Sequence, residues 1–155
     1  MDKQQKINKL IQFIKWMYEN KVPFHSLVLE PKFLLEENKV FIKVNKKENL
    51  IGNYKYEMLH GGVIASIMDI TGGAIVSIGL IKKIIDKPEE QIKEKIFKIG
   101  TIDLRVDFLK PGQGEQFLAT GHTLRIGNRI AVVHTFLYNE QNILIASGAA
   151  TYSTG

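Results

Sequence analysis

The residues of this sequence whose types and spacing suit chemistry lie in one apolar stretch. Gly61 and Gly62 open it, and Asp69 is its only formally charged residue up to position 81. Backbone N–H groups at a helix N-terminus lack partners and carry partial positive charge, and glycine lets a carbonyl oxygen approach them closely. The stretch therefore offers an oxyanion hole and a carboxylate, which suits acyl transfer, although two glycines can also simply make a tight turn.

The spacing of these two groups has a geometric consequence. Because an α-helix rises about 1.5 Å per residue, Asp69 should lie about 12 Å along the helix from Gly61. One chain cannot bring both groups to a single carbonyl. If they act on the same bond, two helices must run antiparallel, so the spacing predicts a two-fold homodimer with sites at its interface.

The neighbours of Asp69 on the expected helix are small. Ala65, Ser66, Gly72 and Gly73 lie three or four positions away and share its helix face. A mid-helix glycine costs about 1 kcal/mol relative to alanine, so this strip favours either close packing of another backbone or access for a ligand. A carboxylate on such a face is partly desolvated and is a stronger base or nucleophile than one in water. The alternative is a structural carboxylate held by a cation.

Histidine and cysteine supply few further candidates. His60 directly precedes the glycines and is placed to brace the loop or, alternatively, to transfer a proton. His25, His122 and His134 stand isolated in apolar or strand contexts, so we expect them to be structural. No histidine pair has metal-ligand spacing and the chain has no cysteine, so we expect no metal site, disulfide or thiolate nucleophile.

The chain before this stretch predicts an amphipathic helix and a hairpin. Residues 3–19 carry apolar side chains at helical spacing and lysines on the other face, which indicates a helix laid on a core or, alternatively, on a membrane surface. Residues 33–35 and 40–44 predict two strands. A polar loop over residues 46–57 then leads into the central helix, which is apolar on all sides and should be buried all round.

After the central helix the hydrophobic period changes. Residues 82–98 mix charged and apolar side chains and predict a surface connection with a short helix, whereas strict alternation over residues 102–108 predicts a strand. The order of elements predicts a single α+β domain over residues 1–155, in which a curved sheet wraps the central helix and a second subunit covers what stays open. An antiparallel meander should complete the sheet, with strands over residues 115–125, 130–138 and 143–152.

The net charge, the composition of the central helix and the start of the chain indicate which partners and which location to expect. The formal net charge is +5 and the pI about 9.3, which fits a solvated lysine-rich surface, a nucleic acid, an anionic membrane or a polyphosphate cofactor. No nucleic-acid-binding motif accompanies this charge. The central helix has the length of a membrane span, but its carboxylate and its glycine and hydroxyl residues argue against one. Without an apolar leader at the start, we expect a cytoplasmic protein.

Three ordered motifs give the sequence a family resemblance. They are His60-Gly61-Gly62 followed by Asp69, the residues 100–103 (GTID) and the residues 107–111 (DFLKP). Over residues 30–153 the chain resembles the hotdog-fold acyl-CoA thioesterases of the phenylacetate-degradation type. The resemblance implies a helix wrapped by a five- or six-stranded antiparallel sheet, a homodimer or a dimer of dimers, and no cofactor apart from the coenzyme A of the substrate.

The resemblance also implies roles for single residues. In such enzymes the Gly61 N–H would polarise the thioester carbonyl, Asp69 of the facing subunit would be base or nucleophile, and Asn53 would help organise the site. Thr101 matches a position that orients water or the carboxylate, yet strict strand alternation would turn it away from the helix with Asp103. The residues implied for binding the substrate and its nucleotide are Gly62, Arg125, Gly127, Arg129 and Lys110. Arg125 and Arg129 flank a predicted hairpin turn, and arginines at a hairpin are also common on a solvated surface.

These patterns favour hydrolysis of an acyl-CoA thioester to a carboxylic acid and free coenzyme A. Gly61 would hold the carbonyl and Asp69 would attack it or activate water, while His60 and Asn53 position these parts. Two alternatives stay open: a protein that senses acyl-CoA without hydrolysing it, and a hotdog-fold dehydratase, which the glycine doublet and the spacing of Asp69 suit less well. The acyl group is not readable, because apolar pockets discriminate by only about 1–3 kcal/mol per methylene.

Overall fold

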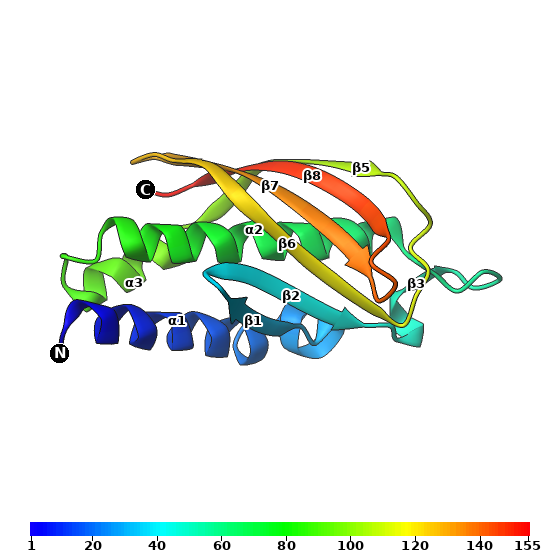
Figure 1. Cartoon of the computed structure of the whole chain (residues 1–155), viewed down its shortest axis with the longest axis horizontal. Helices are drawn as coiled ribbons and strands as arrows, with labels where there is room; N and C mark the ends of the chain where they lie inside the picture. The colour runs from blue at the N-terminus through cyan, green and yellow to red at the C-terminus, as the bar shows by residue number, and fades with distance from the viewer.

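The computed structural model of residues 1–155 has one long helix, α2 (Gly61–Lys83), in the curve of an antiparallel sheet (Figure 1). The predicted α+β arrangement is therefore confirmed. A two-stranded hairpin, β3 (Ile51–Asn53) and β4 (Met58–Leu59), precedes α2 and is separate from this sheet. The strands of the main sheet lie in the order β1 (Lys32–Glu36), β2 (Lys39–Asn45), β6 (Gln116–Ile126), β7 (Ile130–Asn139), β8 (Leu144–Ser153) and β5 (Gly100–Phe108).

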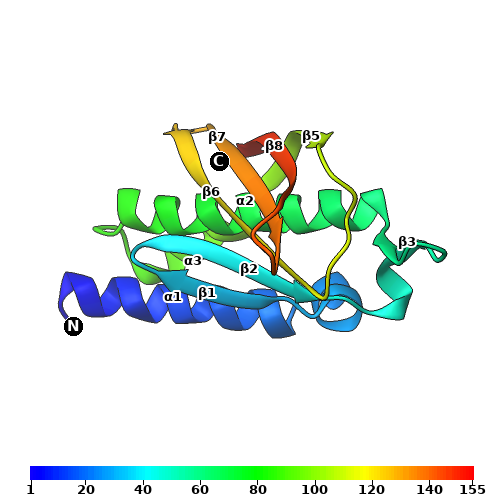
Figure 2. The ribbon, with the colours of Figure 1, turned by 45° about the vertical axis from the view of Figure 1, so that its right-hand side comes forward.

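Helix α1 (Lys3–Asn20) lies alongside α2 (Figures 1 and 2). A capping box between Asp2 and Gln5 begins it, and its apolar face packs on α2 and β1 as the sequence predicts. Lys6 bonds carbonyl groups just beyond the C-terminal end of α2, whereas Tyr18 lies against the middle of α2 at Gly73. The two helices therefore run antiparallel. A π-helical segment, η1 (His25–Leu29), follows α1 and turns the chain into β1.

Helix α2 is the core of the fold. It contacts β2, β5, β6, β7 and β8 on one side and α1 and α3 (Glu89–Phe97) on the other. By length and composition α2 could cross a membrane, but 78% of its most apolar window is buried inside the fold. A short 3-10 helix, η2 (Glu48–Leu50), joins β2 to the hairpin before α2. Burial by the chain itself accounts for the apolar stretch.

Strands β6, β7 and β8 form the predicted antiparallel meander. Strand β5, which precedes them in the chain, pairs with β8 and not with β6, and β2 takes the place beside β6. The segment 109–115 therefore crosses from one side of the sheet to the other instead of closing a hairpin (Figure 1). As a result β5 is an edge strand, and its Leu104 and Val106 are only half-buried.

Candidate functional site

The N-terminus of α2 presents a free backbone donor. His60 is the N-cap residue, and its Nδ1 accepts a hydrogen bond from the Gly62 N–H at 2.9 Å. The N–H groups of Val63 and Ile64 bond to the His60 carbonyl. The Gly61 N–H is thus the one amide of this turn without a partner in the chain. Because Nδ1 accepts, the neutral His60 ring carries its hydrogen on Nε2, and the histidine braces the turn.

Asn53 lies in the hairpin that leads to this turn. Its Oδ1 accepts from the N–H groups of Lys55 and Tyr56 at 3.2 and 3.3 Å, which shapes the hairpin loop. The side-chain amide nitrogen has no partner in the chain. A Cβ on Gly52 would lie 2.7 Å from the His60 Cα, so the hairpin packs directly against the N-cap. Asn53 is therefore held at the Gly61 end of α2.

Gly61 borders a cavity of about 420 Å³ at this end of the helix. Phe108 covers the glycine, with a ring carbon 3.5 Å from the place of a Cβ. Lys110 and Pro111, from the segment that crosses the sheet, also line the cavity. The crossing segment therefore brings one of the predicted nucleotide-binding residues, Lys110, to the free amide.

Asp69 is held by two hydroxyl groups from distant parts of the chain. Thr101 Oγ1 donates to Oδ1 of Asp69 at 2.8 Å, and the Tyr152 hydroxyl lies 3.0 Å from the same oxygen and 2.8 Å from the Asp69 carbonyl oxygen. Burial, followed by the charge of Asp69 and the hydrogen bond to it, raises the pKa of Tyr152, so the phenol stays protonated as a donor. Oδ2 has no partner in the chain and is free for a ligand.

A β-bulge turns Thr101 toward the helix. Strand β5 pairs with β8 at Thr101↔Tyr152 and next at Asp103↔Thr151, so Ile102 is an extra residue. The bulge leaves Ile102 58% exposed. Strict alternation, which would turn Thr101 away from α2 with Asp103, is therefore wrong at this point of the strand.

Two tyrosines of the same chain fill the strip of small residues on α2. A Cβ on Gly72 would overlap the Tyr152 hydroxyl, and one on Gly73 would lie 2.9 Å from the Tyr18 hydroxyl. Burial raises the pKa of Tyr18 to about 12, with the charge of Asp69 adding to this and a hydrogen bond to Ser77 opposing it. The glycines thus admit aromatic side chains that the sequence pattern did not identify.

Asp69 opens onto a second cavity, of about 280 Å³, between α1, η1, α3 and the start of β5. This cavity shares no lining residue with the cavity at Gly61. Because α2 is continuous between the two, one chain holds Gly61 and Asp69 about 12 Å apart. His25, for which sequence context predicted a structural role, lines the Asp69 cavity.

The hairpin turn between β6 and β7, which carries Arg125 and Arg129, lies at the opposite end of α2 from Gly61. Lys83 donates hydrogen bonds to the Ile126 carbonyl and to the Asn128 side chain, which ties the turn between β6 and β7 to the C-terminus of α2. Arg125 and Arg129 are exposed beside this turn. One chain therefore does not bring the arginines together with Lys110 or Gly61.

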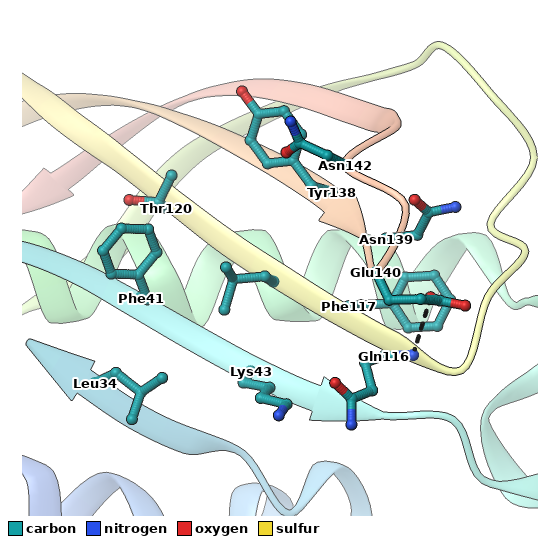
Figure 3. A pocket seen from close by; sticks show the side chains of 11 residues that line it. Leu34, Phe41, Lys43, Gln116, Phe117, Thr120, Tyr138, Asn139, Glu140 and Asn142 are labelled. Carbon is teal, nitrogen blue, oxygen red and sulfur yellow. Dashed lines mark hydrogen bonds between the residues drawn. The ribbon is translucent and has the colours of Figure 1, made fainter. Parts of the chain in front are cut away.

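A further cavity, of about 490 Å³, lies on the sheet face turned away from α2 (Figure 3). Leu34, Phe41 and Tyr138 are among its walls, and none of the predicted site residues is. The chain also has no group of three or more His, Asp or Glu side chains that could hold a metal ion. Among the predicted catalytic residues, Gly61 lines one of the two cavities along α2, and Asp69 and Thr101 line the other.

Comparison with known proteins agrees with this geometry. The profile of the thioesterase superfamily matches residues 56–146, from the hairpin before α2 to the start of β8. The medium/long-chain acyl-CoA thioesterase YigI of Escherichia coli is 42% identical over 106 residues, which cover 68% of each chain. The protein of the same name from Salmonella typhimurium is 36% identical over 148 residues, which cover 94% of each chain.

Solved structures agree as well. A protein from Shewanella oneidensis related to the thioesterase superfamily superposes with a TM-score of 0.91 at 37% identity, covering 96% of this chain and 97% of that one. A Bacillus halodurans protein determined with CoA shares the fold, with a TM-score of 0.69 at 16% identity, covering 100% of this chain and 95% of that one. The chain therefore belongs to the thioesterase superfamily and is a thioester hydrolase with the hotdog fold.

Proposed function

We propose that the chain hydrolyses acyl-CoA thioesters to a carboxylic acid and free coenzyme A, as a member of the phenylacetate-degradation branch. One observation carries this proposal: the same helix presents a Gly61 N–H without a hydrogen-bond partner and an Asp69 carboxylate. Oδ1 of Asp69 accepts hydrogen bonds from Thr101 and Tyr152, whereas Oδ2 has no partner in the chain. The relatives named as medium/long-chain acyl-CoA thioesterases support the substrate class. The mechanism uses no cofactor beyond the substrate, and a cytoplasmic location stays a prediction.

A second copy of the chain completes each site in a two-fold homodimer. Because Gly61 and Asp69 lie about 12 Å apart on one α2, a thioester needs Gly61 of one protomer and Asp69 of its partner. Strand β5 supports this arrangement, since it is an edge strand whose outer side has no partner strand, and its Leu104 and Val106 are half-buried. Antiparallel pairing of β5 with its symmetry mate would continue the sheet, and two such dimers could associate further.

The reaction follows from the two halves of the site. The Gly61 N–H holds the thioester oxygen, where negative charge develops during attack. Oδ2 of the partner's Asp69 takes a proton from a water that attacks the carbonyl carbon, or it attacks that carbon itself, and the C–S bond breaks to release the thiolate. In the second case a water then hydrolyses the anhydride between the acyl group and Asp69, which releases the acid and restores the carboxylate. Thr101 and Tyr152 orient the carboxylate through Oδ1. His60 fixes the glycine turn at the other half.

Positive charge lies where the nucleotide of coenzyme A would extend. If Gly61 of one protomer lies beside the partner's Asp69, the C-terminus of the partner's α2 reaches about 20 Å beyond Gly61. It carries the hairpin with Arg125, Gly127 and Arg129. Coenzyme A leaving the site in this direction would pass Gly62 and Lys110 of one protomer and then meet the hairpin of the other.

A panel of acyl-CoAs of increasing chain length, assayed with a thiol reagent, tests this function. We expect thiol release with the highest kcat/KM for medium or long chains. Asp69→Asn should lower kcat by about 10²- to 10⁴-fold while light scattering still gives the dimer mass. Thermal stabilisation by acyl-CoA without thiol release would indicate a sensing protein instead, and hydration of an enoyl-CoA would indicate a dehydratase.

A further inference from the structure

The cavity that holds Asp69 contains a second titratable group that the mechanism above does not use. His25 comes from the N-terminal segment η1, and its side chain is nine-tenths buried. It lines the cavity together with Asp69, Tyr18 and Tyr152. A buried imidazole beside a carboxylate in the same cavity is a candidate for handling a water or a proton.

The contacts of the His25 ring decide which nitrogen faces a ligand. Nδ1 lies 3.0 Å from the Tyr18 carbonyl oxygen. A carbonyl oxygen only accepts hydrogen bonds, so Nδ1 carries the hydrogen and Nε2 of the neutral ring has a lone pair. Nε2 has no partner in the chain, and it is not among the fully buried polar atoms, of which only Thr135 Oγ1 lacks a partner. Because His25 lines the cavity, a water there can donate a hydrogen bond to Nε2.

We propose that His25 is a positioning residue for the hydrolytic water. A water in this cavity would donate one hydrogen bond to Oδ2 of Asp69 and the other to Nε2 of His25, which leaves an oxygen lone pair directed at the thioester carbonyl. On attack the bond from water oxygen to carbonyl carbon forms, one proton passes from the water to Asp69, and the C–S bond breaks to release the thiolate. This role rests on the proposed thioesterase function.

The charges around His25 favour the neutral ring that this role requires. Burial lowers the pKa of His25, and the hydrogen bond to Tyr18 and the charge of Asp69 oppose this in smaller measure. Tyr18 and Tyr152 stay uncharged because burial raises the pKa of each. The side chains that α3 and β5 contribute to the cavity do not titrate. Protonation of His25 below its lowered pKa would remove the acceptor, so we expect the rate to fall on the acid side of neutrality.

Two substitutions separate the acceptor from the packing of the ring. His25→Asn keeps a donor near the position of Nδ1 but removes Nε2, whereas His25→Gln places a non-titrating acceptor near the position of Nε2. We expect His25→Asn to lower kcat about ten- to a hundredfold with little change in KM. His25→Gln should recover part of kcat and lose the acid limb that His25 causes.

The matched control is His122→Asn. His122 on β6 is the cross-strand partner of His134 on β7, and it lines neither of the cavities along α2. The variant should leave kcat, KM and the pH profile unchanged. A wild-type kcat and pH profile in His25→Asn would overturn the proposal. So would a lower Tm in both His25 variants with an unchanged pH profile, since that result would make His25 a support of η1 only.

A nitrogen-resolved NMR titration keeps this test independent of the assay. In the wild type we expect the Nδ1-protonated tautomer of His25, and in Asp69→Asn a lower pKa of His25 because the nearby negative charge is lost. The other tautomer, or a pKa that does not move, would overturn the role of His25 even in an active thioesterase. No thioester hydrolysis by the wild type, with the expected titration intact, would instead overturn the proposed function and the water with it.

Discussion

The two halves of the proposed site lie on the same helix but are built differently. At Gly61 the functional group is a backbone N–H, and its neighbour His60 fixes the turn that presents it. At Asp69 the functional group is a side chain, and Thr101 and Tyr152 reach it from strands far along the chain. The first half is therefore sensitive to local backbone changes, whereas the second is sensitive to packing between distant elements.

The largest effect expected at the backbone half comes from Gly61→Pro. Proline lacks the N–H and is favoured at the first position of a helix, and the ψ of 137° at His60 is a conformation accepted before proline. We expect kcat to fall about 10²- to 10³-fold with Tm nearly unchanged. Gly61→Ala keeps the N–H, and its Cβ would meet Phe108 at an ordinary 3.5 Å. Equal thiol release by the two variants would show that this amide is not the oxyanion donor.

Combining a Gly61 variant and an Asp69 variant in one dimer tests whether the two groups of a site come from different protomers. A heterodimer of Gly61→Pro with Asp69→Asn has one site with both substitutions and one site with both native groups. The purified heterodimer should therefore have about half of the wild-type kcat, although each parent is nearly inactive. Activity is measured after co-expression with two different tags and purification on both. A heterodimer no more active than its parents would place both groups of a site in one chain.

The same contrast explains how much of the site could be predicted from the sequence. The glycine turn and Asp69 are local features, and the rise of a helix is enough to separate them into two halves. The contact of Thr101 depends on the bulge at Ile102, which apolar alternation does not reveal. Tyr152 reaches Asp69 only because Gly72 leaves room for its ring. The sequence shows that a strip of the helix is small, but what fills it is decided by the whole fold.

The fold shows a similar division between local and long-range information. The long helices and the strands of the main sheet have their own periodicity, so the sequence predicts their existence and approximate bounds, including the hairpin formed by β1 and β2. The loop predicted over residues 46–57 is wrong in part, because η2 and β3 lie within it and are too short to show a period. The position of β5 beside β8 is not predicted, because residues 109–115 contain turn residues that fit a hairpin as well as a crossing. Strand order depends on which neighbour covers the exposed edge of each strand, and no single segment carries that information.

A smaller effect is expected at the carboxylate half from Tyr152→Phe. The change removes one of the two hydroxyl groups on Oδ1 and keeps the ring that packs over Gly72. A hydrogen bond to a charged group contributes about 1.5–3 kcal/mol, and Thr101 still holds the carboxylate, so we expect kcat to fall about tenfold with KM unchanged. Tyr138→Phe, on the outer face of the sheet (Figure 3), is the matched control. A lower Tm with unchanged kcat would make the Tyr152 hydroxyl a support of the fold alone.

The smallest effect is expected for the exposed residues proposed to bind the nucleotide of coenzyme A, since they belong neither to the Gly61 half nor to the Asp69 half of the site. Lys110→Ala, Arg125→Ala and Arg129→Ala should each raise KM by about two- to fivefold and leave kcat unchanged, because exposed charge pairs contribute about 0.2–1 kcal/mol. The increase should shrink at high salt. Lys32→Ala is the control, since Lys32 lies on β1 at the opposite edge of the sheet from β5.

The pattern among these variants tests the arrangement of the dimer. Lys110 lies at the Gly61 end of α2, and the arginines lie at the far end. Only antiparallel helices bring both to one coenzyme A, so a raised KM in all three variants supports that arrangement. A change in Lys110→Ala alone would confine the nucleotide to the protomer that supplies Gly61. A change in the arginine variants alone would move the nucleotide to the protomer that supplies Asp69, because there the hairpin belongs to the same chain as the carboxylate.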